Sequence, residues 1–202
     1  GYKKWLDYIL DVPMMFAIEG NNFVRAHSTT FRERLNDSTK SKPTMAEFEL
    51  HISAIVPDVR LKTFIEVRSA DMCSNEINLA QTAFYKGILY DDIARKEVLS
   101  LMKDFSFPEL VQMRYSAAKF ALNGNGKHWH LGELASALIK ISAGGLKRQP
   151  RINKNGGDES IYLQPFEEIT HKRETIADRA IQKFGNSTLT QQQMRQYLAG
   201  DY

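Results

Sequence analysis

The spacing of apolar residues changes near residue 77. Before that point, apolar residues form short runs separated by turn residues. From Ile77 onward they recur every three or four positions, the period of an amphipathic helix. Strands followed by helices predict an α+β fold. We therefore expect a β-rich segment over residues 1–76 and a helical segment of the same domain over residues 77–202.

The N-terminal segment contains one clear hairpin signal and one clear capping signal. Apolar runs at Met14–Ile18 and Phe23–Val24 flank the turn sequence at residues 20–22, which predicts a β-hairpin. Thr44 and Glu47 have the spacing of a capping box, which predicts that a short helix begins there.

Two further strands are expected around Pro57-Asp58. The run His51–Val56 reads as one strand, and Leu61–Val67 reads as the strand that returns after the turn. The helical segment is then divided by glycine, proline and polar residues. The predicted helices cover residues 77–88, 93–101, 109–122, 131–146 (ending at Gly144-Gly145), 166–184 and 190–198.

Composition narrows the class of protein. The 202 residues carry a net charge of +3, and the lysines and arginines form no basic stripe, so nucleic acid is not an expected partner. The single cysteine, Cys73, excludes an internal disulfide framework. No segment has the length of a membrane span or the core of a signal peptide. We therefore expect a cytoplasmic protein without a membrane partner.

The densest group of chemically active residues lies in the run His51–Asp71. Side chains alternate along a strand, so Glu66 and Arg68 share one face. One interpretation is a cross-strand ion pair on a solvated face. The other is a metal–phosphate site, in which the carboxylate binds Mg²⁺ and the guanidinium binds a phosphate or a substrate carboxylate. These two residues do not decide between the interpretations.

Their neighbours favour phosphate chemistry. Arg60 and Lys62 add positive charge near Glu66 and Arg68, and Asp71 adds a second carboxylate. Phosphoryl transfer is catalysed mainly by charge and positioning, which such a group of side chains can supply.

Other candidate sites are weaker. His128 and His130 have no third ligand nearby, so a loop that supports helix packing is the favoured interpretation. Cys73 has no neighbouring base and is interpreted as structural. Asp91-Asp92 is expected to begin a helix, whose dipole favours acidic residues.

Several motifs resemble the plant and proteobacterial glutamate–cysteine ligases in order and spacing. They are Asp11-Val12-Pro13-Met14, Phe31-Arg32 with Leu35, the run from His51 through Pro57-Asp58-Val59-Arg60-Leu61-Lys62, residues 64–71, residues 83–91 and, less specifically, residues 162–169. The resemblance extends over nearly the whole chain.

The resemblance implies a partial glutamine-synthetase-like fold, whose antiparallel sheet holds ATP, Mg²⁺ and glutamate. It also implies a ligase that activates the glutamate γ-carboxylate as an acyl phosphate, which the cysteine amine attacks. By the same resemblance, Glu66 is a metal ligand and Arg68 is the catalytic residue that contacts phosphate or glutamate. Arg60 and Lys62 contribute to the same phosphate- and substrate-binding field.

The chain departs from the family in three respects. Met15 occupies a position that is usually aromatic, on the strand that contacts the amino-acid substrate, and Ser69 replaces a common glycine. The earlier half of the family's sequence, with further metal ligands, is also missing. We therefore expect a C-terminal portion that is inactive without its N-terminal half. Two alternatives are a non-catalytic module that binds a nucleotide or a partner protein, and a basic adaptor for nucleic acid.

Overall fold

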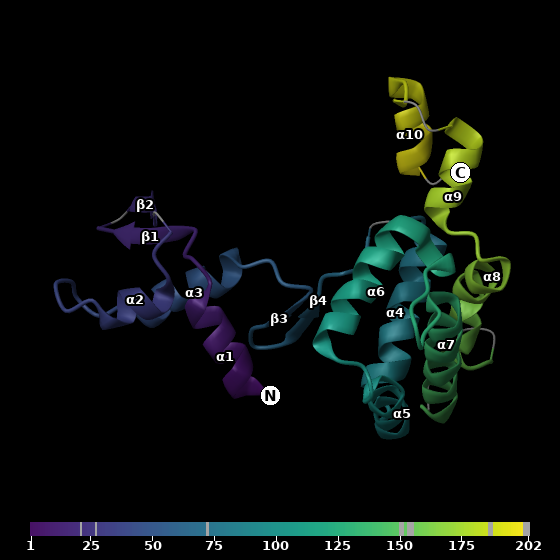
Figure 1. Ribbon diagram of the computed structural model, residues 1–202, viewed down its shortest axis with the longest axis horizontal. Coiled ribbons are helices and arrows are strands. Elements are labelled where there is room, and N and C mark those ends of the chain that lie inside the picture. Colours follow the sequence, from purple (N-terminus) through teal and green to yellow (C-terminus); the bar gives the residue numbers. More distant parts are fainter. Residues whose placement is uncertain are drawn as a thin grey trace. The chain divides into compact units, whose positions relative to one another are not determined.

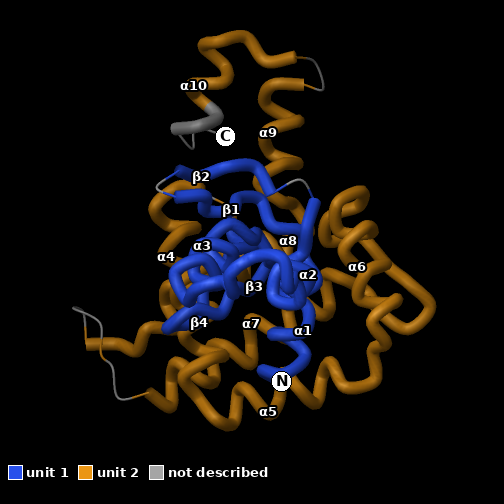
Figure 2. The backbone as a smooth tube through the Cα atoms, turned by 90° about the vertical axis from the view of Figure 1, so that its left-hand side faces the viewer, with its two compact units in different colours: residues 1–70 blue, residues 71–202 orange. Residues whose placement is uncertain are grey.

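The computed structural model describes residues 1–20, 22–26, 28–71, 73–149, 152, 156–185 and 188–199 (Figure 1). Helices predominate, and the strands form two antiparallel two-stranded sheets, which confirms the α+β class. Two compact units divide the chain, residues 1–70 and residues 71–202 (Figure 2). That residues 1–76 and 77–202 belong to a single domain stays a prediction. Within the described part, no helix is both long enough and apolar enough to cross a bilayer.

Unit 1 contains the predicted N-terminal hairpin. Its elements are α1 (Tyr2–Asp11), β1 (Phe16–Glu19), β2 (Asn22–Arg25), α2 (Phe31–Asn36), α3 (Met45–Ala54), β3 (Val59–Leu61) and β4 (Ile65–Val67). In the β1–β2 hairpin, Phe16 pairs with Arg25 and Glu19 pairs with Asn22. Gly20 begins the turn with a φ of +61°, a conformation that costs glycine little.

The core of unit 1 lies beside this hairpin. Met14, Ala26 and Phe31 are buried together, and Phe48 packs against them from α3. The Phe31 ring lies 5.1 Å from the Phe48 ring and 5.1 Å from the His51 ring, which stacks on it at an interplanar angle of 21°. These contacts join α2 and α3 to the segment that precedes β1.

The capping prediction for α3 is confirmed, but the strand predicted over His51–Val56 is wrong. Thr44 and Glu47 form a complete capping box, and the helix continues through His51 to Ala54. Phe48, His51 and Ile55 are all buried or packed in the core at helical spacing, so the period of three to four residues continues past His51. Pro57 then disfavours helical backbone at the residue before it, and the chain becomes extended.

The single strand predicted over Leu61–Val67 is also wrong, because this run folds back on itself. Val59–Leu61 and Ile65–Val67 form a short antiparallel hairpin, in which Arg60 pairs with Glu66. The turn consists of residues 62–64, and the Lys62 N–H donates to the Phe64 carbonyl at 2.9 Å. Polar residues at 62 and 63 interrupt the apolar run, which is why the chain turns there.

Unit 2 is helical in the residues that the structure describes. Its elements are α4 (Asn75–Leu89), α5 (Asp92–Met102), α6 (Phe107–Phe120), η1 (Ala121–Asn123), α7 (Leu131–Arg148), η2 (Glu159–Leu163), α8 (Gln164–Lys172), α9 (Ile176–Phe184) and α10 (Gln191–Ala199). The core is formed by Ala83, Ile139, Leu146 and Leu163, from α4, α7 and η2.

The helix predicted to end at Gly144-Gly145 continues to Arg148, and its glycines have a packing role instead. A Cβ on Gly145 would lie 2.0 Å from the Gly87 carbonyl oxygen of α4. On the facing helix, a Cβ on Gly87 would lie 2.3 Å from the Ser142 carbonyl oxygen. The Ser142 hydroxyl donates to the Phe84 carbonyl at 2.9 Å. Small residues therefore allow the backbones of α4 and α7 to touch.

The helix predicted over residues 166–184 is interrupted. Arg173 has a left-handed backbone conformation with a φ of 53° and ends α8. Thr175 and Asp178 form a capping box that begins α9. The periodicity of apolar residues does not reveal this break, because both helices keep the same spacing.

Candidate functional site: the β3–β4 hairpin

The β3–β4 hairpin brings three of the predicted site residues together. The Glu66 carboxylate accepts from Arg60 Nε at 2.7 Å through Oε2 and from Arg68 Nη1 at 2.9 Å through Oε1. The first contact crosses the hairpin between paired residues, and the second joins Glu66 of β4 to Arg68, the residue that follows the strand. Glu66 and Arg68 therefore lie together, as the alternation of the strand predicts.

The two arginines are held differently. Arg60 is 9% exposed, and its Nη1 also donates to the Ser53 carbonyl at 2.7 Å and the Ile55 carbonyl at 3.2 Å. These carbonyls lie at the C-terminal end of α3, where backbone acceptors lack helical partners. Arg68 has a more accessible side chain, and its backbone N–H donates to the Asp58 carbonyl. Arg60 thus links α3 to the hairpin, while the guanidinium of Arg68 reaches solvent.

The electrostatics of this group favour an ionised carboxylate. The hydrogen bond from Arg60 lowers the pKa of Glu66, and the positive charges of Arg60 and Arg68 lower it further. Glu66 is therefore an anion at neutral pH. Its side chain is 30% exposed, and each of its two oxygens already accepts from one arginine.

Lys62 lies apart from this group. It is exposed in the turn between β3 and β4, and none of the contacts described for the hairpin joins its ammonium group to Glu66. In an extended segment, residues 60 and 62 share a face, but the turn at 62–64 breaks that alternation. Its assignment to phosphate or substrate binding stays a prediction.

A complete metal site is not present in the described part of the chain. Among those residues, no three His, Cys, Asp or Glu side chains lie close enough to hold one ion. Glu66 is a hard oxygen donor of the kind that Mg²⁺ prefers, and it fits as one ligand of a larger shell. The other ligands would have to come from outside these residues.

The structure describes the surroundings of the weaker candidates. His128 and His130 are exposed in the loop before α7, where Asn125 and His130 form an isolated bridge. Burial raises the pKa of the Cys73 thiol, and the charge of Asp71 raises it further, which is the opposite of an activated thiolate. Asp91 caps α5 by accepting from the Ala94 N–H at 2.7 Å, which confirms the expected helix start.

Two polar contacts had no signal in the sequence. Asp91 also binds Arg148 through two parallel contacts, of 2.7 Å from Nη2 and 3.1 Å from Nε. The Arg148 guanidinium, together with the Ala94 N–H, lowers the pKa of Asp91 to about 2. His51, expected on a strand, is buried in α3 and bonded to α1. Each partner lies more than forty residues away, a separation that no local pattern encodes.

The hairpin thus carries one carboxylate, Glu66, held between the guanidinium groups of Arg60 and Arg68. Sequence comparison identifies the family to which the chain belongs. Residues 1–200 match the family described as Glutamate-cysteine ligase family 2 (GCS2). The chain belongs to this family.

Curated relatives agree with the family match. The chloroplastic glutamate–cysteine ligase of Nicotiana tabacum is 28% identical over 188 residues, which cover 91% of this chain and 35% of the relative. The enzyme of Arabidopsis thaliana is 29% identical with the same coverage, and that of Medicago truncatula is 28% identical. The chain therefore spans about a third of the length of these relatives.

These names correct one expectation. The sequence led us to expect a cytoplasmic protein, whereas the relatives are named as chloroplastic enzymes. The cytoplasmic assignment is wrong. It rested on the lack of a targeting signal, and a sequence that spans about a third of its relatives is too small a part to support that argument.

Proposed function

We propose that this chain is a portion of an ATP-dependent glutamate–cysteine ligase, which joins the glutamate γ-carboxylate to the cysteine amine. The family match over residues 1–200 carries the proposal. The cluster of Glu66 with Arg60 and Arg68 supports it, because charge and positioning are what phosphoryl transfer requires.

In this proposal the complete protein has a glutamine-synthetase-like fold. Residues 1–76 contribute to its catalytic sheet, and residues 77–202 form a helical part of the same domain. The missing N-terminal half would supply further metal ligands, in agreement with the incomplete ligand set among the described residues. Substrates of the complete enzyme are ATP, glutamate and cysteine.

The proposed reaction has two steps. A γ-carboxylate oxygen of glutamate attacks the terminal phosphorus of ATP, which forms an acyl phosphate and releases ADP. The cysteine amine then attacks the acyl carbon, loses a proton, and expels inorganic phosphate that keeps one oxygen of the original carboxylate. The product is γ-glutamylcysteine.

Each residue of the hairpin has a proposed role in these steps. Glu66 serves as one ligand of Mg²⁺, which neutralises charge on the phosphates when bound. Arg68 is the catalytic residue that stabilises the transferred phosphoryl group or the glutamate carboxylate, because its planar fork can bind two oxygens at once. Arg60 fixes the Glu66 carboxylate, and Arg60 and Lys62 add positive charge to the field around the phosphates.

An isotope experiment tests the reaction. With ¹⁸O in the γ-carboxylate of glutamate, the complete ligase should transfer one labelled oxygen to inorganic phosphate, provided that ATP and cysteine are both present. Phosphate without label would contradict the acyl-phosphate route.

A substitution tests the proposed metal ligand. Glu66→Gln in the complete ligase should remove most activity, since the uncharged amide is a poor ligand for Mg²⁺. The amide keeps one oxygen that can accept from Arg60, so the variant should still fold, which circular dichroism would check. A normal rate at saturating Mg²⁺ would leave Glu66 as a structural ion-pair partner.

A further inference from the structure

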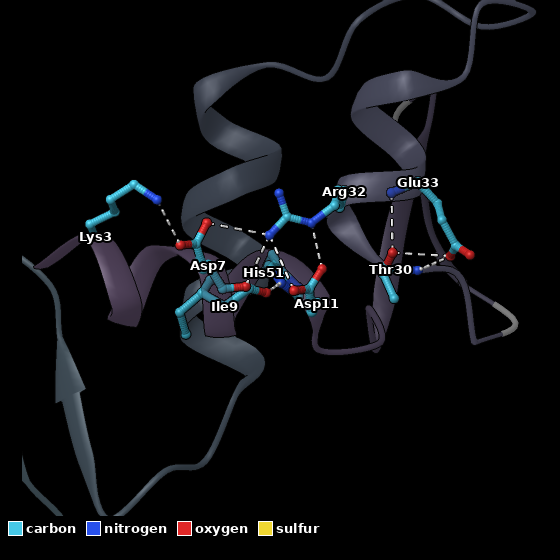
Figure 3. A network of polar contacts seen from close by, with 8 residues as sticks. All are labelled: Lys3, Asp7, Ile9, Asp11, Thr30, Arg32, Glu33 and His51. Carbon is cyan, nitrogen blue, oxygen red and sulfur yellow. Dashed lines mark hydrogen bonds and ion pairs between the residues drawn. The ribbon is translucent and has the colours of Figure 1, made fainter.

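His51 makes a buried contact with the end of α1 (Figure 3). Its Nε2 lies 2.8 Å from the carbonyl oxygen of Ile9. Both residues are shielded from water, with exposed fractions of 2% for His51 and 0% for Ile9. A buried carbonyl that lacks a hydrogen bond is destabilising, so this contact matters to the local structure.

The sequence explains why this carbonyl needs a side-chain donor. In a continuing helix, the Ile9 carbonyl would accept from the backbone N–H of residue 13. Residue 13 is proline, which has no N–H. The Val12 N–H is shared between the Tyr8 carbonyl at 3.2 Å and the Ile9 carbonyl at 3.3 Å, so it compensates only in part. His51 supplies the remaining donor from forty-two positions away.

This contact also fixes the state of the imidazole ring. A carbonyl oxygen only accepts, so Nε2 must carry the hydrogen. Nδ1 is buried, and no hydrogen-bond partner for it exists among the described residues. The bond to Ile9 and the stacking on Phe31 hold the ring so that its Nε2–H points at the carbonyl oxygen.

Other contacts fix the same stretch of chain. Arg32 binds Asp11 through Nε at 2.5 Å and reaches the Asp7 carbonyl through Nη2 at 3.3 Å (Figure 3). Beyond the proline, the Met14 N–H donates to the Thr29 carbonyl at 2.8 Å. Met14 is then buried in the core, whereas Met15 is 53% exposed. The end of α1 thus sets which side chain enters the core and which one faces away from it.

We propose that His51 is a positioning residue, whose Nε2–H replaces the backbone donor that Pro13 lacks and thereby sets the path of the chain from α1 into β1. Its connection to catalysis rests on the proposed function and on the family resemblance, by which the segment at Met15, just before β1, contacts the amino-acid substrate. His51 does not touch substrate itself. It acts through the segment Pro13–Met15.

The first test is a measurement on the wild-type ring. In the complete ligase labelled with ¹⁵N-histidine, the ring nitrogens of His51 should show that Nε2 carries a hydrogen. The signal is assigned by its absence in His51→Gln. A ring whose Nε2 carries no hydrogen would overturn the proposal.

The second test is a double-mutant cycle with Pro13. His51→Leu should increase hydrogen–deuterium exchange in the peptide covering residues 2–15 by about tenfold, because a buried carbonyl loses its donor. In a Pro13→Ala background the increase should fall to about threefold or less, since alanine allows α1 to continue past Val12, which is extended in the wild type, and to pair its N–H with Ile9. His51→Gln keeps a donor at similar reach and should resemble the wild type.

The control for this cycle is His171→Leu, at an exposed position in the last turn of α8. It should leave exchange in residues 2–15 unchanged. Equal increases for His51→Leu in the wild-type and Pro13→Ala backgrounds would mean that the two residues are not coupled, and the proposal would fail. If His51→Leu does not fold, the ring-nitrogen measurement on the wild type still decides.

Kinetics test the connection to catalysis. In the complete ligase, His51→Leu should raise the KM for glutamate or cysteine by about tenfold or more while kcat changes much less, because a displaced strand weakens substrate positioning. His51→Gln should restore KM. An unchanged KM for both substrates would refute the positioning role. A wild-type protein without ligase activity would instead refute the proposed function, and the ring-nitrogen and exchange results would still judge His51.

Discussion

The two arginines that share Glu66 differ in what else they hold. Arg60 divides its donors between the carboxylate and two carbonyls at the end of α3. The other arginine, Arg68, makes its one described side-chain contact with Glu66. Removal of Arg60 would therefore leave the Ser53 and Ile55 carbonyls without this side-chain donor. Arg68, by contrast, can exchange Glu66 for a ligand at little cost in stability.

This difference gives a prediction for Arg68. Arg68→Lys in the complete ligase should lower activity by on the order of 10²-fold, as loss of one transition-state donor typically does. Its unfolding midpoint should change little, because a partly exposed ion pair contributes only about 0–1 kcal/mol and lysine keeps the charge. ADP release with glutamate and cysteine measures the activity.

Arg60→Lys is the matched comparison for Arg68→Lys. An ammonium group cannot contact Glu66, Ser53 and Ile55 with the same fixed geometry, so this variant should lower the unfolding midpoint. If Arg68→Lys retains near-normal turnover, Arg68 lies outside the catalytic machinery.

Asp91 gives a prediction about pH. Its folded-state pKa is about 2, below the ordinary 3.8. A lowered pKa means that the carboxylate stabilises the fold above the unfolded-state value, and this stabilisation is lost as pH falls from 3.8 through about 2. Asp91→Asn should therefore lower the unfolding midpoint at pH 7, and its difference from the wild type should shrink steadily below about pH 4.

Thermal unfolding between about pH 7 and about pH 2.5 measures this difference across the range in which the carboxylate is protonated. Asparagine still caps α5, so the substitution isolates the ion pair with Arg148. The control is Asp92→Asn, whose pair with Arg95 is exposed and should contribute little. A wild-type-minus-variant difference that does not depend on pH would contradict the assigned role of Asp91.

At the scale of helices, the contact between α4 and α7 depends on specific glycines. Gly145→Ala would place a Cβ 2.0 Å from the Gly87 carbonyl oxygen, so the helices must separate. We expect a loss of about 1–3 kcal/mol in the free energy of unfolding, which is typical of overpacking. Chemical denaturation measures it.

The neighbouring glycine provides a control in the same helix turn. At Gly144, a Cβ would lie 3.3 Å from Arg148 Nη1, the end of a side chain that also binds Asp91. Gly144→Ala should cost clearly less stability than Gly145→Ala, because a small shift of the Arg148 side chain relieves the contact and alanine has the higher helix propensity. If both alanine variants lose equal stability, the loss does not arise from the contact with Gly87.

The sequence predicted the elements whose stabilising contacts join residues close to one another along the chain. The Thr44–Glu47 capping box and the turn that begins at Gly20 were both found in the sequence because their partners lie close together along the chain. The extent of α3 was missed, since a short apolar run at His51–Val56 suits either a helix or a strand. The helix is favoured by the packing of His51 against Phe31, two residues that are distant in the sequence.

The same limit applies to the hairpin site. Alternation along one strand was enough to place Glu66 beside Arg68. Alternation alone did not predict that Arg60 lies directly opposite Glu66, because that pairing depends on the turn at residues 62–64. For the same reason, alternation did not predict that Lys62 lies in the turn of the hairpin, and its role in phosphate or substrate binding stays a prediction.

The chain spans about a third of the length of the related ligases. One face of its β3–β4 hairpin is apolar and exposed. On the face of the β3–β4 hairpin opposite Glu66, Val59 is 51% exposed and Ile65 is 61% exposed. A two-stranded sheet with an uncovered apolar face is at best marginally stable in water. We therefore expect the remainder of the ligase to cover this face.

The last prediction concerns the 202-residue chain by itself. In the proposed function its described residues supply one carboxylate of the metal site, Glu66, and a site that lacks most of its ligands should not catalyse. We expect no measurable γ-glutamylcysteine when the purified chain is given ATP, Mg²⁺, glutamate and cysteine. Product should appear when the same residues are joined to the missing part of the ligase, which serves as the positive control. Turnover by the isolated chain, abolished by Glu66→Gln, would mean that these residues already form a complete catalytic site.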